Sequence, residues 1–365
     1  MKYEILKESK EPIYLQLYKA VKEDIINGVY AYGTKLPSKR FLAEELGISV
    51  ITVEHTYSLL CDEGYADSKQ RSRYFVTYSA EETFSSPAST ENLSVFGDHD
   101  TQLDDTFPFS VYAKTMRKIL TAYGDDIFDR CPSSGCLQLK QALCGYLARS
   151  RGINVSKEQI VIGAGAEYLY SVIVQMLGKE RVYAAENPSY EKIEQVYRAN
   201  GVEIEMLSLG AHGIKSGELQ KTSASVLHIT PYRSYPSGVT ATASKKREYI
   251  LWQRKEGNRI IVEDDFESEF SMNAKTQETV FSLSGGDGVI YVNTFSKTIS
   301  PATRIAYMIL PQNLIDTYKE KVGFYSCTVP LYNQLVLAEF INNGDFERSV
   351  NRARRSLRRK LESKK

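Results

Sequence analysis

Histidine, cysteine and long apolar runs are scarce in this chain of 365 residues. The four histidines are scattered along the sequence, so we expect no histidine-rich metal site and no bound metal. The five cysteines show neither a CxxC pair nor the spacing of a zinc site, and an odd number is typical of reduced cytoplasmic thiols. The N-terminus has no apolar signal core, and no stretch is long and apolar enough to span a bilayer. We therefore predict a cytoplasmic protein that does not bind membranes.

An excess of charge of one sign is also absent. The chain has 46 Lys and Arg residues and 45 Asp and Glu residues, and its net charge is +1. Such a balance gives no global attraction to nucleic acid. With 42% hydrophobic and 25% charged residues, the chain is long enough for more than one globular domain. Any contact with DNA must therefore depend on local clusters of basic residues.

The first 78 residues have the pattern of a winged helix-turn-helix. Residues 12–26 place apolar side chains at helical spacing. Ser38 can cap a second helix that ends at Gly47, and Ser49 can start a third. Two strand-like runs follow the third helix. Two short helices joined by a glycine turn and followed by a hairpin are typical of this DNA-binding motif.

Basic residues surround this motif, and we expect it to bind a double-stranded DNA operator. Basic side chains near the first helix of the motif and on the wing can contact phosphates or enter the minor groove. Side chains at the start of the second helix normally meet base edges. A solvated charged surface is the alternative for each residue taken singly. The residues expected to contact DNA are Lys35, Ser38, Lys39, Arg40, Ser49, Thr52, His55, Arg71 and Arg73.

Beyond this motif, the chain changes in composition. Residues 79–92 are small, polar and aperiodic, which is typical of a linker. Apolar strand-like runs then alternate with helical segments at residues 137–148, 171–177 and 191–199, which favours an α/β fold with a mostly parallel sheet covered on both faces. The expected bounds are 1–78 for the winged helix-turn-helix, 79–105 for the linker, 106–345 for the large domain and 346–365 for a basic helix.

A lysine and a carboxylate follow two of the strand-like runs. Lys297 lies shortly after residues 289–292, and Asp264 lies in the acidic segment 263–265 that follows residues 260–262. A lysine amine can form a Schiff base with pyridoxal phosphate, and a buried carboxylate paired with the pyridine nitrogen keeps that nitrogen protonated. A solvated loop lysine is the alternative, and Lys297 alone does not decide between them.

Three further features are consistent with the same cofactor. The strand-like residues 160–162 break at glycines into a helical run, and such a turn presents backbone N–H groups to an anion. The spacing is not GxGxxG, so a single phosphate is favoured over a dinucleotide. Thr294, Ser296 and Arg304 can also hold a phosphate. Tyr190 follows another strand-like run and can stack on a flat cofactor, with a core tyrosine as the alternative.

Five motifs occur in a fixed order along the chain, at residues 36–43, 229–231, 236–238, 263–270 and 294–298. In this combination they resemble the fold type I aminotransferases, and specifically the MocR subgroup of GntR-type transcriptional regulators, in which such a domain is fused to a winged helix. The resemblance implies a pyridoxal 5'-phosphate cofactor and a homodimer, with Lys297 as the Schiff-base lysine, Asp264 as the partner of the pyridine nitrogen and Tyr190 as the stacking ring. It implies a phosphate end formed by Gly165, Ala166, Glu167, Thr294, Ser296 and Arg304.

Some positions depart from the family pattern. Phe266 replaces the tyrosine expected to bond the ring hydroxyl, and Ser234 stands where glutamine is usual, so cofactor retention should be weaker by about 1–3 kcal/mol. Val50 replaces an arginine in the second helix of the DNA-binding motif. The family continues past residue 360 into a small domain that supplies an arginine for the substrate carboxylate, and we expect most of that domain to be missing. Lys192 is a candidate substitute, with a surface lysine as the alternative.

The leading interpretation is a DNA-binding transcriptional regulator whose aminotransferase-like domain binds pyridoxal phosphate, free or as an amine adduct. Binding would change the geometry of paired winged helices. Efficient transamination is not expected without the small domain, because turnover depends on positioning and on water exclusion. Two alternatives stay open: a pyridoxal phosphate-dependent aminotransferase with an accessory DNA-binding module, and a cofactor-free remnant that binds DNA through residues 1–78.

Overall fold

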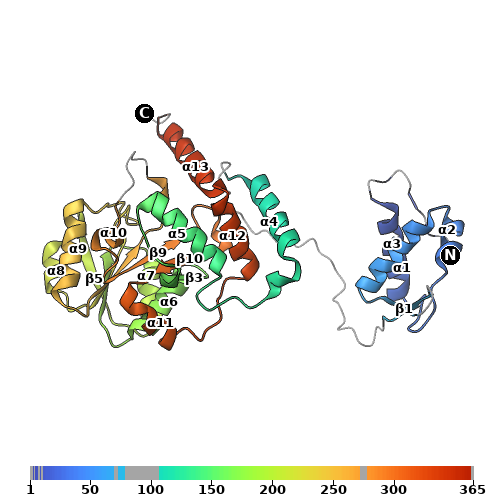
Figure 1. Ribbon diagram of the computed structural model, residues 1–365, viewed down its shortest axis with the longest axis horizontal. Helices are drawn as coiled ribbons and strands as arrows, with labels where there is room; N and C mark the ends of the chain where they lie inside the picture. Colours follow the sequence, from blue (N-terminus) through green and yellow to red (C-terminus); the bar gives the residue numbers. More distant parts are fainter. Residues whose placement is uncertain are drawn as a thin grey trace. The chain divides into compact units, whose positions relative to one another are not determined.

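The computed structural model describes residues 11–69, 73–78, 107–271 and 278–362, together with residues 3, 5, 6 and 9. The chain divides into two compact units, Met1–Gly97 and Asp98–Lys365 (Figure 1). Arg71 and the expected linker at residues 79–105 lie outside the described residues.

In the described part of the smaller unit, three helices precede a β-hairpin. The Ser38 hydroxyl accepts a hydrogen bond of 3.2 Å from the amide of Phe41 and caps the second helix. The Ser49 hydroxyl caps the third helix by accepting a hydrogen bond of 3.0 Å from the amide of Thr52. Gly47 between them has a φ of 60°, which glycine adopts without a steric penalty. The predicted winged helix-turn-helix is confirmed, with α1 (Ile13–Ile26), α2 (Lys39–Leu46), α3 (Val50–Asp62) and antiparallel strands β1 (Ala66–Lys69) and β2 (Arg73–Val76).

Apolar side chains from these elements form one core. Leu17 of α1 and both Val53 and Leu60 of α3 are fully buried, and Val76 brings the hairpin into the same cluster. This packing fixes α3 along its inner face. Ile51, in the first turn of α3, is 71% exposed. The start of the helix is therefore free to meet a ligand.

The described part of the larger unit is built on a sheet of eight strands (Figure 1). Their order is β3-β10-β9-β8-β7-β4-β5-β6. The four pairs from β9 to β5 are parallel, whereas β10 is antiparallel to both of its neighbours and β6 is antiparallel to β5. This mostly parallel sheet confirms the predicted α/β fold. The strands are β3 (Ile160–Gly163), β4 (Tyr183–Asn187), β5 (Ile204–Gly210), β6 (Gly213–Ile214), β7 (Val226–Ile229), β8 (Ile260–Asp264), β9 (Val289–Thr294) and β10 (Ala306–Ile309).

Side chains of the strands alternate between two cores on opposite faces of the sheet. In β3, Ile160 and Ile162 belong to one core, and Val161 between them belongs to the other. Helices α5, α9 and α12 contribute to the first core, and α6, α7 and α11 to the second. The helices are α4 (Phe109–Tyr123), α5 (Leu137–Arg151), α6 (Ala166–Leu177), α7 (Glu191–Ala199), α8 (Ser216–Lys221), α9 (Ala243–Lys255), α10 (Val280–Ser284), α11 (Ile315–Lys321), α12 (Leu331–Asn342) and α13 (Asp345–Glu362). Short 3₁₀ turns are η1 (Gly124–Phe128), η2 (Lys157–Gln159), η3 (Ser268–Phe270), η4 (Pro301–Thr303) and η5 (Gln312–Leu314).

The basic helix predicted near the end of the chain is α13, and it packs on the larger unit. Phe346 and Val350 are buried in the first core, and Arg354 donates a hydrogen bond through Nε to the carbonyl of Glu269. Apolar contacts rather than charge alone therefore hold this helix in place.

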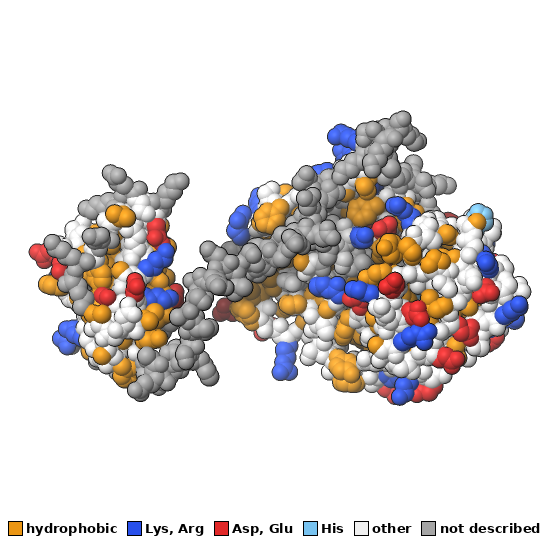
Figure 2. All heavy atoms as spheres, turned by 180° about the vertical axis from the view of Figure 1, so that it is seen from behind, with side chains coloured by type: hydrophobic (Ala, Val, Ile, Leu, Met, Phe, Trp, Pro, Cys, Tyr) orange, Lys and Arg blue, Asp and Glu red, His pale blue; other side chains and the backbone are white. Residues whose placement is uncertain are grey.

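Charges of both signs are interspersed on the face of each unit that Figure 2 shows. On the face shown in Figure 2, Lys and Arg side chains alternate with Asp and Glu side chains. Such mixing produces no strong field of one sign. None of the described helices combines the length and the apolar character needed to cross a bilayer.

Candidate functional site

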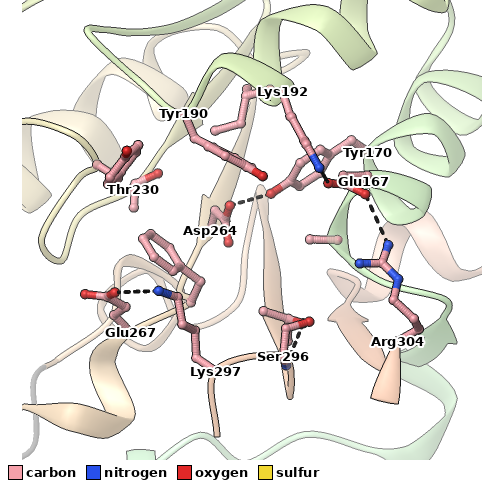
Figure 3. Close-up of a pocket in the computed structure, with 15 residues that line it drawn as sticks. Glu167, Tyr170, Tyr190, Lys192, Thr230, Asp264, Glu267, Ser296, Lys297 and Arg304 are labelled. Atoms are coloured by element: carbon pink, nitrogen blue, oxygen red, sulfur yellow. Dashed lines mark hydrogen bonds and ion pairs between the residues drawn. The ribbon is translucent and has the colours of Figure 1, made fainter. Parts of the chain in front are cut away.

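A pocket with a volume of about 520 Å³ lies at the carboxyl ends of the parallel strands (Figure 3). Asp264 is the last residue of β8, Thr294 is the last residue of β9, and Ala166 begins α6. Ligand sites of α/β sheets form at this edge. The pocket brings together eight side chains that were proposed from the sequence: Ala166, Glu167, Tyr190, Asp264, Thr294, Ser296, Lys297 and Arg304.

Asp264 is the buried acid of the pocket, with 5% of its surface exposed. The Tyr170 hydroxyl donates a hydrogen bond of 2.5 Å to Oδ2 of Asp264. Oδ1 of the same carboxylate is buried and has no hydrogen-bond partner. Burial raises the pKa of Tyr170 well above its usual value, and the neighbouring Asp264 raises it further, so the hydroxyl remains a donor. The unpaired Oδ1 is a ready acceptor for a cationic group of a ligand.

A second layer of polar groups lies behind Asp264. Nε2 of His228 is 3.8 Å from Oδ2 of Asp264, and Nδ1 of His228 is 2.8 Å from the Tyr197 hydroxyl. The ring of Tyr170 packs edge-on against His228, with centroids 4.9 Å apart. These contacts restrict how far the Asp264 carboxylate can turn.

Lys297 lies in the turn after β9, and its half-exposed side chain points toward Glu267 (Figure 3). The Nζ atom of Lys297 is 3.4 Å from Oε1 of Glu267. Arg233 approaches the other oxygen of Glu267, with Nη1 at 3.7 Å from Oε2. The Glu267 carboxylate is therefore shared between two cationic side chains.

The anion end of the pocket is formed at the start of α6. Gly165 has a φ of 99°, and a Cβ atom at this position would lie 2.5 Å from Nη2 of Arg304. The positive φ favours glycine here, and any Cβ atom would displace the guanidinium from its place beside the helix terminus. Ser296 and Thr294 lie nearby, with their hydroxyl oxygens 2.9 Å apart.

Glu167, in the first turn of α6, occupies this end of the pocket with its own negative charge. Its carboxylate accepts a hydrogen bond of 2.8 Å from Lys192 and one of 3.1 Å from Arg304. The hydrogen bond from Lys192, and then that from Arg304, lowers the pKa of Glu167 below its usual value. Lys192 therefore lines the pocket, and both cations already have a carboxylate partner.

Aromatic rings form one wall of the pocket. Tyr190 is 39% exposed and packs edge-on against Tyr235, with centroids 6.2 Å apart. Phe266, which has no hydroxyl, lines the pocket with them. The exposure of Tyr190 and its position in the lining favour a ligand-facing ring over a core tyrosine.

Ser234 contacts a buried acid behind the pocket. Its hydroxyl donates a hydrogen bond of 2.5 Å to Oε2 of Glu186. Burial raises the pKa of Glu186 to about 7, against the effects of the Ser234 and Thr230 hydrogen bonds. Glu186 therefore binds a proton near neutral pH.

Several pocket residues were not assigned a role by the sequence analysis. Glu267 belongs to the acidic motif around Asp264, and that motif was the signal that could have found it. Tyr170 occupies an apolar helical pattern, which gives no sign that its hydroxyl faces a carboxylate. The lining residues without an earlier assignment are Tyr170, Ile193, Thr230, Tyr235 and Glu267.

The candidate DNA-contacting residues of the smaller unit differ in their availability. Arg40 of α2 is exposed, as is His55 of α3. Lys39 instead forms an ion pair of 2.6 Å with Glu54, which ties α2 to α3. Exposed positions in the described residues are Lys35, Ser38, Arg40, Ser49, His55 and Arg73, and Thr52 is half-buried.

Comparisons with known proteins find a matching protein family for each of the two units. Residues 13–76 match the family of bacterial regulatory proteins, gntR family, and residues 100–363 match aminotransferase class I and II. The uncharacterized HTH-type transcriptional regulator YdeL of Bacillus subtilis is 33% identical over 359 residues, which cover 96% of this chain and 77% of YdeL. The probable rhizopine catabolism regulatory protein MocR of Rhizobium meliloti is 27% identical over 373 residues, covering 96% of this chain and 76% of MocR.

A solved structure resembles the larger unit. The kynurenine aminotransferase of Pyrococcus horikoshii, in complex with PMP, superposes with a TM-score of 0.62 at 23% identity. The match covers 68% of this chain and 64% of that aminotransferase. The chain therefore spans less than two thirds of the length of this enzyme, and the likeness establishes the fold.

Proposed function

Because the chain belongs to the MocR-like transcriptional regulators, in which a GntR-type helix-turn-helix precedes an aminotransferase class I and II domain, we propose that its larger unit binds pyridoxal 5'-phosphate and uses it to sense an amine. The cofactor, when bound, supplies an aldehyde and an electron-withdrawing ring.

The observation that carries the proposal is the unpaired oxygen of Asp264. Oδ1 is buried beside the pocket without a partner, while Tyr170 holds Oδ2. A buried carboxylate oxygen without a partner is costly, and a protonated pyridine nitrogen would satisfy it. The residues present thus fit the cofactor at its ring end.

The phosphate end of the cofactor would meet the start of α6. Backbone N–H groups at this helix terminus, together with Ser296 and Arg304, provide donors for an anion. From the Arg304 guanidinium, Glu167 accepts only the hydrogen bond of Nη2, so the other N–H groups can hold a phosphate, whose binding the negative charge of Glu167 opposes.

Lys297 is the proposed attachment point for the aldehyde. Its amine must be unprotonated when it attacks a carbonyl carbon, so the ion pair with Glu267, at 3.4 Å, must open first. Tyr190 and Phe266 would cover the ring and exclude water from it. Phe266 cannot donate a hydrogen bond to the ring hydroxyl. Binding of the cofactor would therefore depend on the contacts to its ring nitrogen and to its phosphate.

The smaller unit would bind a DNA operator, as a pair of winged helices in a homodimer. An effector can change DNA binding only if it binds one arrangement of the dimer better than the other. We propose that an amino compound that exchanges with Lys297 at the cofactor is this effector.

The test of the regulatory proposal is the affinity for the DNA next to the gene, measured by fluorescence anisotropy with and without pyridoxal phosphate and an amine. We expect the affinity to change with the cofactor in the wild-type chain and to stay constant in Lys297→Ala. An affinity that ignores the cofactor in both proteins would overturn the proposal. Steady turnover of an amino donor with a keto acid, abolished in Lys297→Ala, would instead support an aminotransferase with an accessory DNA-binding module.

A further inference from the structure

Two cysteines that are far apart in the sequence share one hydrogen-bond donor. Nε2 of Gln334, in α12, lies 3.2 Å from Sγ of Cys131 and 3.4 Å from Sγ of Cys327. Cys131 lies in the segment between η1 and α5, and Cys327 lies between α11 and α12. Because both sulfurs contact the same nitrogen atom, they lie close together, and both thiols are free and half-buried.

Gln334 holds both segments from a fully buried position. Its Oε1 accepts a hydrogen bond of 2.8 Å from the amide of Cys136, and its Nε2 donates one of 2.8 Å to the carbonyl of Val329. The amide therefore fixes the backbone on each side of the thiol pair. A fixed backbone favours reaction between the two sulfurs, because little chain entropy is lost when they join.

The two thiols are not equivalent. The hydrogen bond from Cys131 lowers the pKa of Cys327 to about 7, although burial opposes this, and hydrogen bonds from Val329 and Gln334 lower it further. The pKa of Cys131 is raised by the same contact with Cys327 and by burial. Of the two thiols, Cys327 therefore loses its proton more readily, and the thiolate is the form that reacts with oxidants.

The Cys327 segment also contacts the turn that leads to the anion end of the pocket. The amide of Ala164 donates a hydrogen bond of 3.1 Å to Oγ1 of Thr328, and the Cys327 thiol lies 3.9 Å from the carbonyl of Ile162. Ala164 precedes Gly165, which makes room for Arg304. Thr328 and Cys327 therefore connect this segment directly to the turn.

We propose that Cys131 and Cys327 form a reversible disulfide in response to a hydroperoxide, and that this disulfide weakens anion binding at the start of α6. The second part rests on the proposed function, because the anion is the phosphate of the cofactor. The first part is independent of it.

The chemistry balances with one hydroperoxide for each disulfide. The Cys327 thiolate attacks hydrogen peroxide, which gives a Cys327 sulfenic acid and hydroxide. The Cys131 thiol then attacks the sulfenic sulfur, an S–S bond forms and hydroxide leaves, taking up the thiol proton as water. Two thiols are oxidised and one peroxide is reduced to two waters.

The first experiment treats the full chain with an equimolar amount of hydrogen peroxide, blocks the remaining thiols and maps the peptides without reduction. We expect the wild-type chain to lose two of its five free thiols. The new bond should join Cys131 to Cys327 and disappear with dithiothreitol. Cys131→Ser should yield a sulfenic acid on Cys327 that dimedone traps, and Cys327→Ser should yield neither product.

Two other half-buried cysteines provide matched controls. Cys61→Ser and Cys144→Ser should form the same disulfide as the wild-type chain. Unreacted thiols at both Cys131 and Cys327, or a disulfide that joins any other pair, would overturn the first part of the proposal.

The second experiment measures the affinity for pyridoxal phosphate before and after oxidation. We expect roughly two- to tenfold weaker binding in the oxidised wild-type chain, as for the loss of one hydrogen bond. The double variant Cys131→Ser, Cys327→Ser should bind equally well before and after treatment. Equal affinity of the two wild-type forms would overturn the link to the pocket. If neither form binds the cofactor, the proposed function fails with that link, whereas the disulfide map still decides the first part.

Discussion

The Tyr170 hydroxyl holds Oδ2 of Asp264 at 2.5 Å, and Oδ1 of the same carboxylate is buried without a partner. The protein thereby orients one oxygen and leaves the other for a ligand. An acceptor held in this way needs no reorganisation when a cationic ring nitrogen arrives, which is why it favours a cofactor with such a nitrogen.

Asp264→Asn should weaken the binding of pyridoxal phosphate by roughly tenfold to hundredfold, because a hydrogen bond between charged groups contributes about 1.5–3 kcal/mol. Tyr170→Phe removes only the orienting hydroxyl and should have a smaller effect. Titration of each full-length variant with pyridoxal phosphate measures the two affinities. An Asp264→Asn variant that binds as tightly as the wild-type chain would contradict the assignment of Asp264.

Glu167→Gln should strengthen the binding of pyridoxal phosphate and of inorganic phosphate by about fivefold at low salt. The substitution frees Arg304 and removes a negative charge, and one such charge at about 4 Å is worth about 1 kcal/mol in water. Glu194→Gln is the control, since Glu194 pairs with Arg198 on the exposed side of α7. If Glu167→Gln binds phosphate more weakly, Glu167 positions the cations instead of competing for them.

The stability of the larger unit should fall as the pH rises from about 4.5 to about 7. The pKa of Glu186 is raised from its ordinary value of 4.5 to about 7, so over this range the folded chain holds a proton that the unfolded chain releases. The stabilisation is complete below pH 4.5, is lost as the pH rises through 7, and does not change further above that.

Glu186→Gln should remove part of this dependence, by at most on the order of 3 kcal/mol. The pKa of Glu263 is also raised to about 7 by burial, so a dependence of the same sign should remain. Denaturant unfolding of the two proteins at several pH values between 5 and 8 checks this. Identical curves for both would show that Glu186 does not carry a proton in the folded state.

Arg40→Ala should weaken binding to any DNA duplex and reduce the slope of log affinity against log salt by about 0.9, the value for one phosphate contact. Arg40 is exposed in the first turn of α2, at the expected phosphate-facing side of the motif. Lys19→Ala is the control, because Lys19 of α1 pairs with Glu11, which precedes that helix. An unchanged slope in Arg40→Ala would exclude Arg40 from the interface.

Local signals in the sequence were sufficient for the helices of the smaller unit and for part of the larger one. The caps at Ser38 and Ser49 and the glycine at 47 depend on neighbouring residues only, and these helices were confirmed. The helix at residues 191–199 was predicted with its observed bounds. The ends of the strands were predicted less accurately. Strand β8 includes Asp264 and β9 includes Thr294, because pairing with adjacent strands extends both past their apolar runs.

Contacts between distant segments could not be predicted. Tyr170 and Asp264 are 94 positions apart, and Gln334 and Cys131 are 203 positions apart. Which side chains meet is decided by the order of strands in the sheet and by packing of the helices, and one sequence does not reveal either. The pairing of Lys192 with Glu167 was missed for the same reason.

Covalent attachment of the cofactor at Lys297 tests the central claim most directly. The purified full-length chain would be mixed with pyridoxal phosphate, reduced with borohydride and mapped by mass spectrometry, with Lys297→Ala and Lys192→Ala treated in parallel. We predict one adduct, on Lys297, in the wild-type and Lys192→Ala proteins, and none at equal concentrations in Lys297→Ala. An adduct on other lysines that persists in Lys297→Ala, or no adduct in any of the three, would contradict the proposal that this pocket is a working pyridoxal phosphate site.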